Sequence, residues 1–344
     1  MGSVRGIDVE RVTDWITDNV KGFTPPLTFD LIAGGHSNLT FKVTDADGTP
    51  FVLRRPPLDH VLPTAHDMTR EFRAISGMGP TPVPVPDALG LCTDTEVNGA
   101  PFYVMSYVEG YVLHDDKAAL VFDEKERGDL GRHFIDVLAD MHAVDPDEVG
   151  IGDLGRKEGY IARQLKRWHS QWEQSKTREL PLIDEIHDFL LDRIPEQGPA
   201  TMVHGDYRLG NCLSVKPGRI AAVLDWEICT LGDPMADVGY VMSTWPEPSD
   251  DLPARTGVPS LVPGFPGRAE LLERYAKRSG RDVSQIDYYT AFSYWKSACI
   301  VEGVYARYLG GALGDTDVQF QTFKDGVERS ARMAKQAIDR LDRS

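Results

Sequence analysis

The segment VHGDYRLGNCLSVKPGRIAAVLDWEICTLGDPMADVG, residues 203–239, decides the fold of this chain. It presents three chemically distinctive side chains in order: Asp206, Asn211 and Asp225. Residues 211–215 and 220–226 are rich in Val, Leu and Ile and predict two short strands, joined by the turn Lys-Pro-Gly-Arg at 216–219. A hairpin of this kind would bring Asn211 and Asp225 together despite their separation in sequence.

These residue types suit the transfer of a phosphoryl group. Such a reaction needs little covalent help from the protein, but it needs a hydroxyl held in line and cations that neutralise the spreading negative charge. Asp206 can accept the hydroxyl proton. Asn211 and Asp225 offer a neutral and an anionic oxygen, the hard ligands that Mg²⁺ prefers. The segment therefore predicts a catalytic base and two metal ligands. A plainer alternative is that both aspartates cap turns and Asn211 satisfies a loop backbone.

The motifs HGDYRLGN, VLDWE and GDPMADVG together resemble the aminoglycoside phosphotransferase and choline kinase superfamily, a small-molecule branch of the protein-kinase-like fold. In this resemblance His204-Gly205-Asp206 stands where protein kinases carry His-Arg-Asp, and Asp225-Trp226-Glu227 stands where they carry Asp-Phe-Gly. HGD alone is a weak signal, whereas the pattern over about thirty residues is specific. The resemblance implies an α+β fold with a small antiparallel β-rich N-lobe, residues 1–108, and a larger, mainly helical C-lobe, residues 109–344, that holds the catalytic loop and the acceptor site.

The upstream segment FDLIAGGHSNLTFKVTDADGTPFVLRRPP, residues 29–57, fits the first of these lobes. It predicts three strands with a glycine-containing loop at the first connection and a turn at residues 45–48. The loop consists of Gly34, Gly35, His36, Ser37 and Asn38, and its small residues would let backbone N–H groups approach the phosphates of ATP. It is not a Walker A motif, because GxxxxGK[ST] is missing. An ordinary hairpin turn remains the alternative for this loop taken alone.

The third strand departs from the family pattern. The family carries a lysine there that touches the α and β phosphates and pairs with a helix glutamate, whereas this chain has Arg54 at the aligned position and Arg55 on the opposite face. A guanidinium can hold phosphate as a bidentate fork. The expected partner of Arg54 is Glu71, in a predicted helix. Val-Leu-Arg and GGHSNLTF resemble the subgroup of kinase-like domains associated with acyl-CoA dehydrogenases.

The predicted strand PFYVMSYVEG, residues 101–110, takes the place of the hinge between the lobes. In the family the backbone of this strand reads the adenine edge, so the resemblance places Met105, Ser106, Tyr107 and Val108 next to the base of ATP. An ordinary core strand is the alternative, because backbone recognition leaves almost no side-chain signature.

Composition narrows the classes of partner and compartment. The four cysteines are scattered without CxxC pairing, which predicts neither a zinc site nor a disulfide framework and favours the cytoplasm. We expect no membrane span and no secretory signal, because no run of ~18 apolar residues occurs and the N-terminus has no basic-then-apolar pattern. A formal net charge of -16 argues against nucleic acid as a partner. The oligomeric state is open.

The acceptor is the least determined part. The long loop 244–267 is a candidate binding element; it contains Trp245 and Phe265, three acids and Arg255, and Arg268 follows it. The acids, Glu247, Asp250 and Asp251, would suit a polycationic acceptor, but the arginines dilute them. The aromatic side chains of residues 288–308 are expected to pack in the core, whereas Glu302 is a polar candidate for the acceptor site, with pairing to a nearby arginine as its alternative.

Two functions follow. One is an ATP- and Mg²⁺-dependent kinase that phosphorylates a hydroxyl of a small molecule, with Asp206 as the base. The other is a kinase-like pseudoenzyme that binds a nucleotide or metabolite as a sensor or scaffold, favoured only by the lysine-to-arginine departure.

Overall fold

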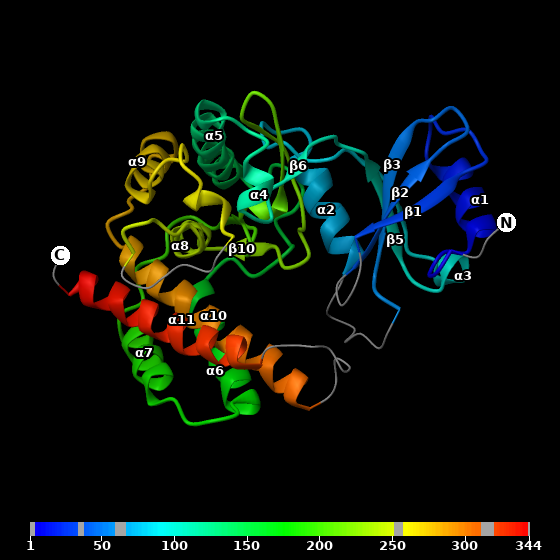
Figure 1. Ribbon diagram of the computed structural model, residues 1–344. Helices are drawn as coiled ribbons and strands as arrows, with labels where there is room; N and C mark the ends of the chain where they lie inside the picture. Colours follow the sequence, from blue (N-terminus) through cyan, green and yellow to red (C-terminus); the bar gives the residue numbers. More distant parts are fainter. Residues whose placement is uncertain (1–3, 34–37, 59–66, 251–256, 311–319, 343–344) are drawn as a thin grey trace.

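The structure, a computed structural model, describes residues 4–33, 38–58, 67–250, 257–310 and 320–342. It consists of an antiparallel five-stranded sheet beside a larger, mainly helical part (Figure 1). The predicted α+β fold, with a small β-rich part and a larger helical part, is confirmed. Gly34, Gly35, His36 and Ser37 of the predicted phosphate loop lie outside the described residues.

The strands of the described chain form three sheets. The first has the order β1-β2-β3-β5-β4, the second pairs β10 with β7, and the third has the order β6-β8-β9. Their bounds are β1 Thr28–Ala33, β2 Leu39–Thr44, β3 Pro50–Arg55, β4 Ala88–Cys92, β5 Phe102–Ser106, β6 Tyr111–Val112, β7 Thr201–Val203, β8 Cys212–Val215, β9 Arg219–Val223 and β10 Thr230–Gly232.

The helices make up most of the remaining described chain. Their bounds are α1 Val9–Asn19, α2 Met68–Met78, α3 Thr95–Asn98, α4 Asp116–Ala119, α5 Glu124–Ala143, α6 Tyr160–Ser175, α7 Pro181–Asp192, η1 Leu209–Asn211, α8 Met235–Thr244, η2 Pro259–Leu261, α9 Arg268–Ser279, α10 Ile286–Leu309 and α11 Phe320–Leu341.

Two helices cover the two faces of the large sheet. Helix α1 begins at the N-cap Asp8 and buries Val12 and Ile16 against one face. Helix α2 begins at the N-cap Asp67, whose carboxylate accepts hydrogen bonds from the first free N–H groups. It lies on the other face, between the sheet and the helical part (Figure 1).

The register of the sheet decides which arginine faces which helix. Antiparallel pairing sets Arg54 opposite Tyr103 and Arg55 opposite Leu39. Because successive strand residues point to opposite faces, Arg54 shares the α2 face with Tyr103. Arg55 lies on the α1 face, where its guanidinium donates to the carbonyl groups of Gly6 and Asn98.

The helical part is built around the two small sheets. Its continuous core extends from α5 through β7–β10 to α10 and α11. Helix α8 packs so closely on α10 that a Cβ atom added at Gly239 would lie 2.5 Å from the backbone of Tyr289. None of the helices in the described ranges is both long enough and apolar enough to cross a membrane.

Candidate active site

The loop that carries Asp206 follows strand β7 and is fixed through its backbone. The carboxylate of Asp237, on α8, accepts hydrogen bonds from the N–H groups of His204 at 2.7 Å and Gly205 at 2.8 Å. The imidazole Nε2 of His204 lies 2.9 Å from the carbonyl oxygen of Leu224, which can only accept, so Nε2 carries the proton. Gly205 has a φ of 85°, a conformation that favours glycine. The loop is thus joined both to α8 and to the chain that precedes Asp225.

The predicted base, Asp206, is held by three side chains. Asn211 Nδ2 donates to its carboxylate at 2.7 Å and to its carbonyl oxygen at 2.9 Å. The Nε atom of Arg208 lies 3.3 Å from both carboxylate oxygens. The hydroxyl of Tyr240 donates to Oδ1. Both oxygens of Asp206 therefore have a donor in this structure.

Asn211 and Asp225 are brought together by the hairpin of β8 and β9, as the sequence predicts. Cys212 pairs with Val223, and the N–H of Leu224 donates to the carbonyl of Asn211 at 2.8 Å. Asp225 follows in a left-handed conformation with a φ of 65°. Aspartate adopts this region more readily than most residues, at a cost of about 1–3 kcal/mol. The strained turn aims the Asp225 carboxylate back toward the large sheet.

Arg54 meets Asp225 across the two parts of the molecule. One guanidinium nitrogen of Arg54 lies 2.6 Å from Asp225 Oδ1, and its Nε lies 2.9 Å from Glu71 Oε2. Burial works against the charge of Arg54, but the two carboxylates outweigh it and raise its pKa. Arg54 therefore stays charged, and the predicted partnership of Arg54 with Glu71 is present.

Glu71 is fully buried and contacts three polar side chains. It forms an ion pair with Arg54, and it accepts hydrogen bonds from Asn38 Nδ2 at 2.7 Å and from the hydroxyl of Tyr103 at 3.0 Å. Burial raises the pKa of Glu71 to about 7, against the opposing effects of Arg54 and Tyr103. We call Asn38, Arg54, Glu71 and Asp225 the phosphate-side network.

The donor set fits a magnesium ion. Asn211 commits its amide nitrogen to Asp206, which leaves the amide oxygen as the atom able to bind a cation. Asp225 already holds a cationic group, the guanidinium of Arg54. An anionic and a neutral oxygen on adjacent segments match the preference of Mg²⁺ for hard ligands.

The hinge residues occupy the end of β5 and the chain after it. Met105 and Ser106 are the last residues of the strand, and Tyr107 and Val108 lie beyond it. The N–H of Ser106 donates to the carbonyl of Asp87 at 2.9 Å, and its hydroxyl accepts from the N–H of Asp87 at 2.8 Å. Because the N–H and hydroxyl groups of Ser106 are engaged, Tyr107 and Val108 are the better candidates for contacts to the adenine ring.

A cavity of about 750 Å³ opens beside the base. Arg208 and Tyr240 line it next to Asp206, and its further walls come from α8, α10, α11 and the segment 257–260. Ser243, Thr244 and Ser297 contribute hydroxyl groups, and the lining also contains apolar side chains and the charged Asp325 and Arg329 of α11. We call this space the acceptor cavity.

The acids predicted to suit a polycation are partly neutralised. The carboxylate of Glu247 lies 3.0 Å from the guanidinium of Arg268, and Asp250 pairs with the same arginine. Asp250 borders the acceptor cavity, but its charge is shared with Arg268. Asp251 and Arg255 lie outside the described residues.

Glu302 pairs with Arg178, which was the alternative to a place in the acceptor site, and it is not among the residues that line the acceptor cavity. It is fully buried, and it accepts hydrogen bonds from Thr177 N and Oγ1, both at 2.7 Å, and from Arg178 at 3.0 Å. It fixes the connection between α6 and α7 to α10. Of the aromatic group, Tyr294 borders the cavity, whereas the core contains Tyr288, Tyr289, Phe292 and Trp295.

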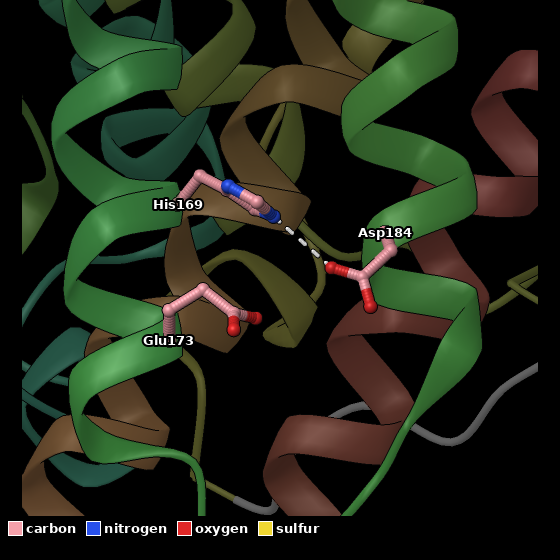
Figure 2. A group of neighbouring side chains, drawn as sticks. All are labelled: His169, Glu173 and Asp184. Atoms are coloured by element: carbon pink, nitrogen blue, oxygen red, sulfur yellow. Dashed lines mark hydrogen bonds and ion pairs between the residues drawn. The ribbon is translucent and has the colours of Figure 1, made fainter.

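A separate acidic and imidazole cluster lies on α6 and α7. Figure 2 shows His169 and Glu173 of α6 turned toward Asp184 of α7, with His169 Nε2 3.0 Å from Asp184 Oδ1. Glu173 also pairs with Lys176 at 3.2 Å. All three side chains are partly exposed, and their pairing joins the two helices. An imidazole nitrogen is not a ligand of choice for Mg²⁺, so this cluster does not compete with Asn211 and Asp225 for that ion.

Three side chains at the site were not singled out from the sequence: Arg208, Asp237 and Tyr240. Arg208 and Asp237 belong to the motifs HGDYRLGN and GDPMADVG, so these motifs could have indicated that both residues lie near Asp206. Tyr240 had none, because a single tyrosine on an apolar helix is indistinguishable from a core residue.

Comparisons with known proteins agree with this geometry. The sequence model described as the phosphotransferase enzyme family matches residues 28–282. Acyl-CoA dehydrogenase family member 10 of Mus musculus is 33% identical over 303 residues, which cover 86% of this chain but 28% of that protein. This chain spans less than half the length of the curated relatives that it matches.

Solved structures extend the likeness to the whole fold. A protein from Ralstonia eutropha, provisionally assigned as an aminoglycoside phosphotransferase, is 32% identical with a TM-score of 0.82, and the match covers 98% of each chain. A thermostable mutant of aminoglycoside phosphotransferase APH(4)-Ia, in complex with ADP and hygromycin B, matches with a TM-score of 0.61 at 15% identity, over 95% of this chain and 97% of that one. The resemblance predicted from the motifs, including its acyl-CoA dehydrogenase subgroup, is confirmed.

Proposed function

We propose that this chain, which belongs to the phosphotransferase enzyme family, moves the γ-phosphoryl group of ATP to a hydroxyl group of a small molecule. The observation that carries the proposal is the placement of Asp206, Asn211 and Asp225 on one loop and hairpin, beside a cavity large enough for a metabolite. The ADP complex of APH(4)-Ia supports a nucleotide in this fold.

In this reaction Asp206 accepts the proton of the attacking hydroxyl group. Asn211 orients the Asp206 carboxylate through its amide nitrogen, and its amide oxygen and Asp225 would hold Mg²⁺. When bound, Mg²⁺ neutralises the charge of the phosphate oxygens. Arg54 would turn from Asp225 toward the α and β phosphates, while Glu71 keeps it aligned. The loop 34–38 would cover the phosphates, and Met105 to Val108 would contact adenine.

The pseudoenzyme alternative loses its main argument. It rested on arginine in place of the family lysine, yet Arg54 makes the ion pair with Glu71 that the lysine makes in the family. The retained base and the two oxygen ligands favour an active kinase.

We further propose that the acceptor is a largely apolar metabolite with one hydroxyl group, such as a hydroxyacyl compound. The pairing of Glu247 and Asp250 with Arg268 removes much of the negative charge that a polycationic aminoglycoside would need. Arg208 adds a positive group at the base. The acyl-CoA dehydrogenase names of the relatives point to acyl compounds by analogy. We also propose a cytoplasmic location, because all four cysteines are free, as is usual in a reducing compartment.

Binding of ATP with and without Mg²⁺, followed by ADP release across a panel of hydroxylated metabolites, tests the proposal. We expect Mg²⁺-dependent binding and turnover of at least one hydroxyacyl or alcohol substrate, abolished in the Asp206→Asn variant. Binding without turnover across a broad panel would favour the pseudoenzyme instead.

A further inference from the structure

Tyr240 stands between the base and the acceptor cavity. Its hydroxyl donates to Asp206 Oδ1, and its side chain lines the cavity together with Arg208. An acceptor hydroxyl that gives its proton to Asp206 has to approach from this cavity. The phenol of Tyr240 therefore occupies a position that an acceptor hydroxyl needs.

The direction of this hydrogen bond is fixed. Burial raises the pKa of Tyr240 far above its usual range, and the neighbouring charge of Asp206 raises it further. The phenol thus keeps its proton and acts as the donor to the carboxylate.

The helix that carries Tyr240 is held firmly, so only the side chain is free to turn. Gly239 packs against the backbone of Tyr289, and Ser243 Oγ lies 2.7 Å from Ser293 Oγ of α10. One turn before Tyr240, Asp237 binds the backbone of the catalytic loop. Open volume beside the ring lies in the acceptor cavity, which gives the phenol space to rotate away from Asp206.

We propose that Tyr240 guards Asp206 by occupying Oδ1, the atom that would take the proton of an attacking water, and gives way only to a bound acceptor. The Asp206 side chain is 28% exposed, so the guard lies in this hydrogen bond and not in closure to solvent. A single water makes few contacts with the cavity walls, whereas an acceptor gains binding energy from many of them, and that energy offsets the loss of the Tyr240 hydrogen bond. Tyr240 acts as a positioning residue that keeps ATP hydrolysis low when no acceptor is present. This inference rests on the proposed kinase function.

The suppressed side reaction is a simple hydrolysis. The water oxygen forms a bond to the γ-phosphorus, the bond from that phosphorus to the β–γ bridging oxygen breaks, and ADP leaves. The water proton passes to the Asp206 carboxylate and then to solvent, so ATP and water give ADP, phosphate and a proton. The same base serves both reactions, and what differs is which hydroxyl group reaches it.

The test needs no knowledge of the acceptor. Release of ADP from Mg²⁺-ATP, without any acceptor, is measured for the wild type and for Tyr240→Phe, which keeps the ring but removes the hydroxyl. The matched control is Tyr288→Phe, which removes a buried phenol hydrogen bond to the carbonyl of Leu190, 2.7 Å away, outside the acceptor cavity. The double variant Asp206→Asn/Tyr240→Phe tests whether any gain depends on the base.

We expect Tyr240→Phe to hydrolyse ATP about tenfold faster than the wild type, the scale of effect for losing a hydrogen bond to a charged group. Tyr288→Phe should match the wild type, and the double variant should lose the gain. A residue with a merely structural role would lower hydrolysis or leave it unchanged, and either result in a variant that still binds nucleotide overturns the guard. Phosphate found on Tyr240 by mass spectrometry would also overturn it, because the residue would then be an acceptor. A wild type that fails to bind Mg²⁺-ATP would refute the kinase proposal and the guard together.

Discussion

The phosphate-side network and the acceptor cavity are built in opposite ways. The network joins three charged groups and the amide of Asn38 at short distances, with Arg54 between the buried Glu71 and the partly exposed Asp225. The cavity is wide, and hydroxyl, charged and apolar groups from α8, α10, α11 and several loops line it. The transfer of a phosphoryl group from ATP places the same demands on the phosphate-side network whatever the acceptor is. The acceptor cavity can differ with the acceptor. The difference explains why the type of reaction is easier to predict from the sequence than the identity of the acceptor.

We expect the largest effect from substitutions of the two proposed Mg²⁺ ligands. Asp225→Ala should abolish productive Mg²⁺-nucleotide binding, because a divalent ion loses an anionic oxygen. Asn211→Ala removes only a neutral oxygen and should cost less. Activity titrated against Mg²⁺ measures both.

Because alanine is strained at a φ of 65°, Asp225→Asn is the control that keeps the turn and removes the charge. Unchanged metal dependence in all three variants would place the ion elsewhere.

We expect the next largest effect from Asp206, where a substitution should affect phosphoryl transfer but not nucleotide binding. Asp206→Asn should slow transfer by about 10²–10⁴, the usual cost of removing a general base, and leave ATP affinity nearly unchanged. Single-turnover rates and nucleotide binding measured on the same preparation check this. Near-normal turnover by the folded variant would remove Asp206 from its role.

Arg54 and Arg55 form a matched pair on opposite faces of β3. Arg54→Ala should raise the Michaelis constant for ATP and lower turnover together, because it removes the phosphate anchor and leaves Glu71 buried without its cation. Breaking such a pair costs about 3–5 kcal/mol of stability.

Arg55→Ala should leave the Michaelis constant alone but cost about 1–3 kcal/mol, because it leaves buried carbonyl groups without a donor. Thermal melts and steady-state kinetics separate the two outcomes. Equal kinetic effects at both positions would mean that the anchor is misplaced.

The smallest effect should come from the acids beside the cavity. With Arg268 as their partner, neutralising Glu247 and Asp250 together should change turnover of a hydroxyacyl acceptor by less than about fivefold, the scale of a partly exposed ion pair. Kanamycin-like sugars should remain poor acceptors throughout. A clear preference for aminoglycosides, lost when Asp250 and Asp251 are neutralised, would overturn our proposal for the acceptor.

The fold and the contacts of the phosphate-side network could be predicted from the sequence because both depend on patterns within short segments. The order HGD, Asn and Asp reports a loop and a hairpin, and alternation along β3 separates Arg54 from Arg55. The acceptor side leaves no such record. Tyr240 meets Asp206 only because α8 packs on α10, and the neutralisation of Glu247 depends on where α9 begins at Arg268. Contacts of this kind depend on tertiary packing, which spacing along the chain does not encode.

The left-handed backbone at Asp225 also has a consequence for the evolution of this fold. In the proposed reaction one position supplies both an anionic ligand for Mg²⁺ and a conformation that only aspartate, asparagine and glycine adopt at low cost. A descendant that drifts away from catalysis while keeping its shape should therefore carry asparagine or glycine at this position. Such a lineage would lose its chemistry in one codon change and keep its architecture intact.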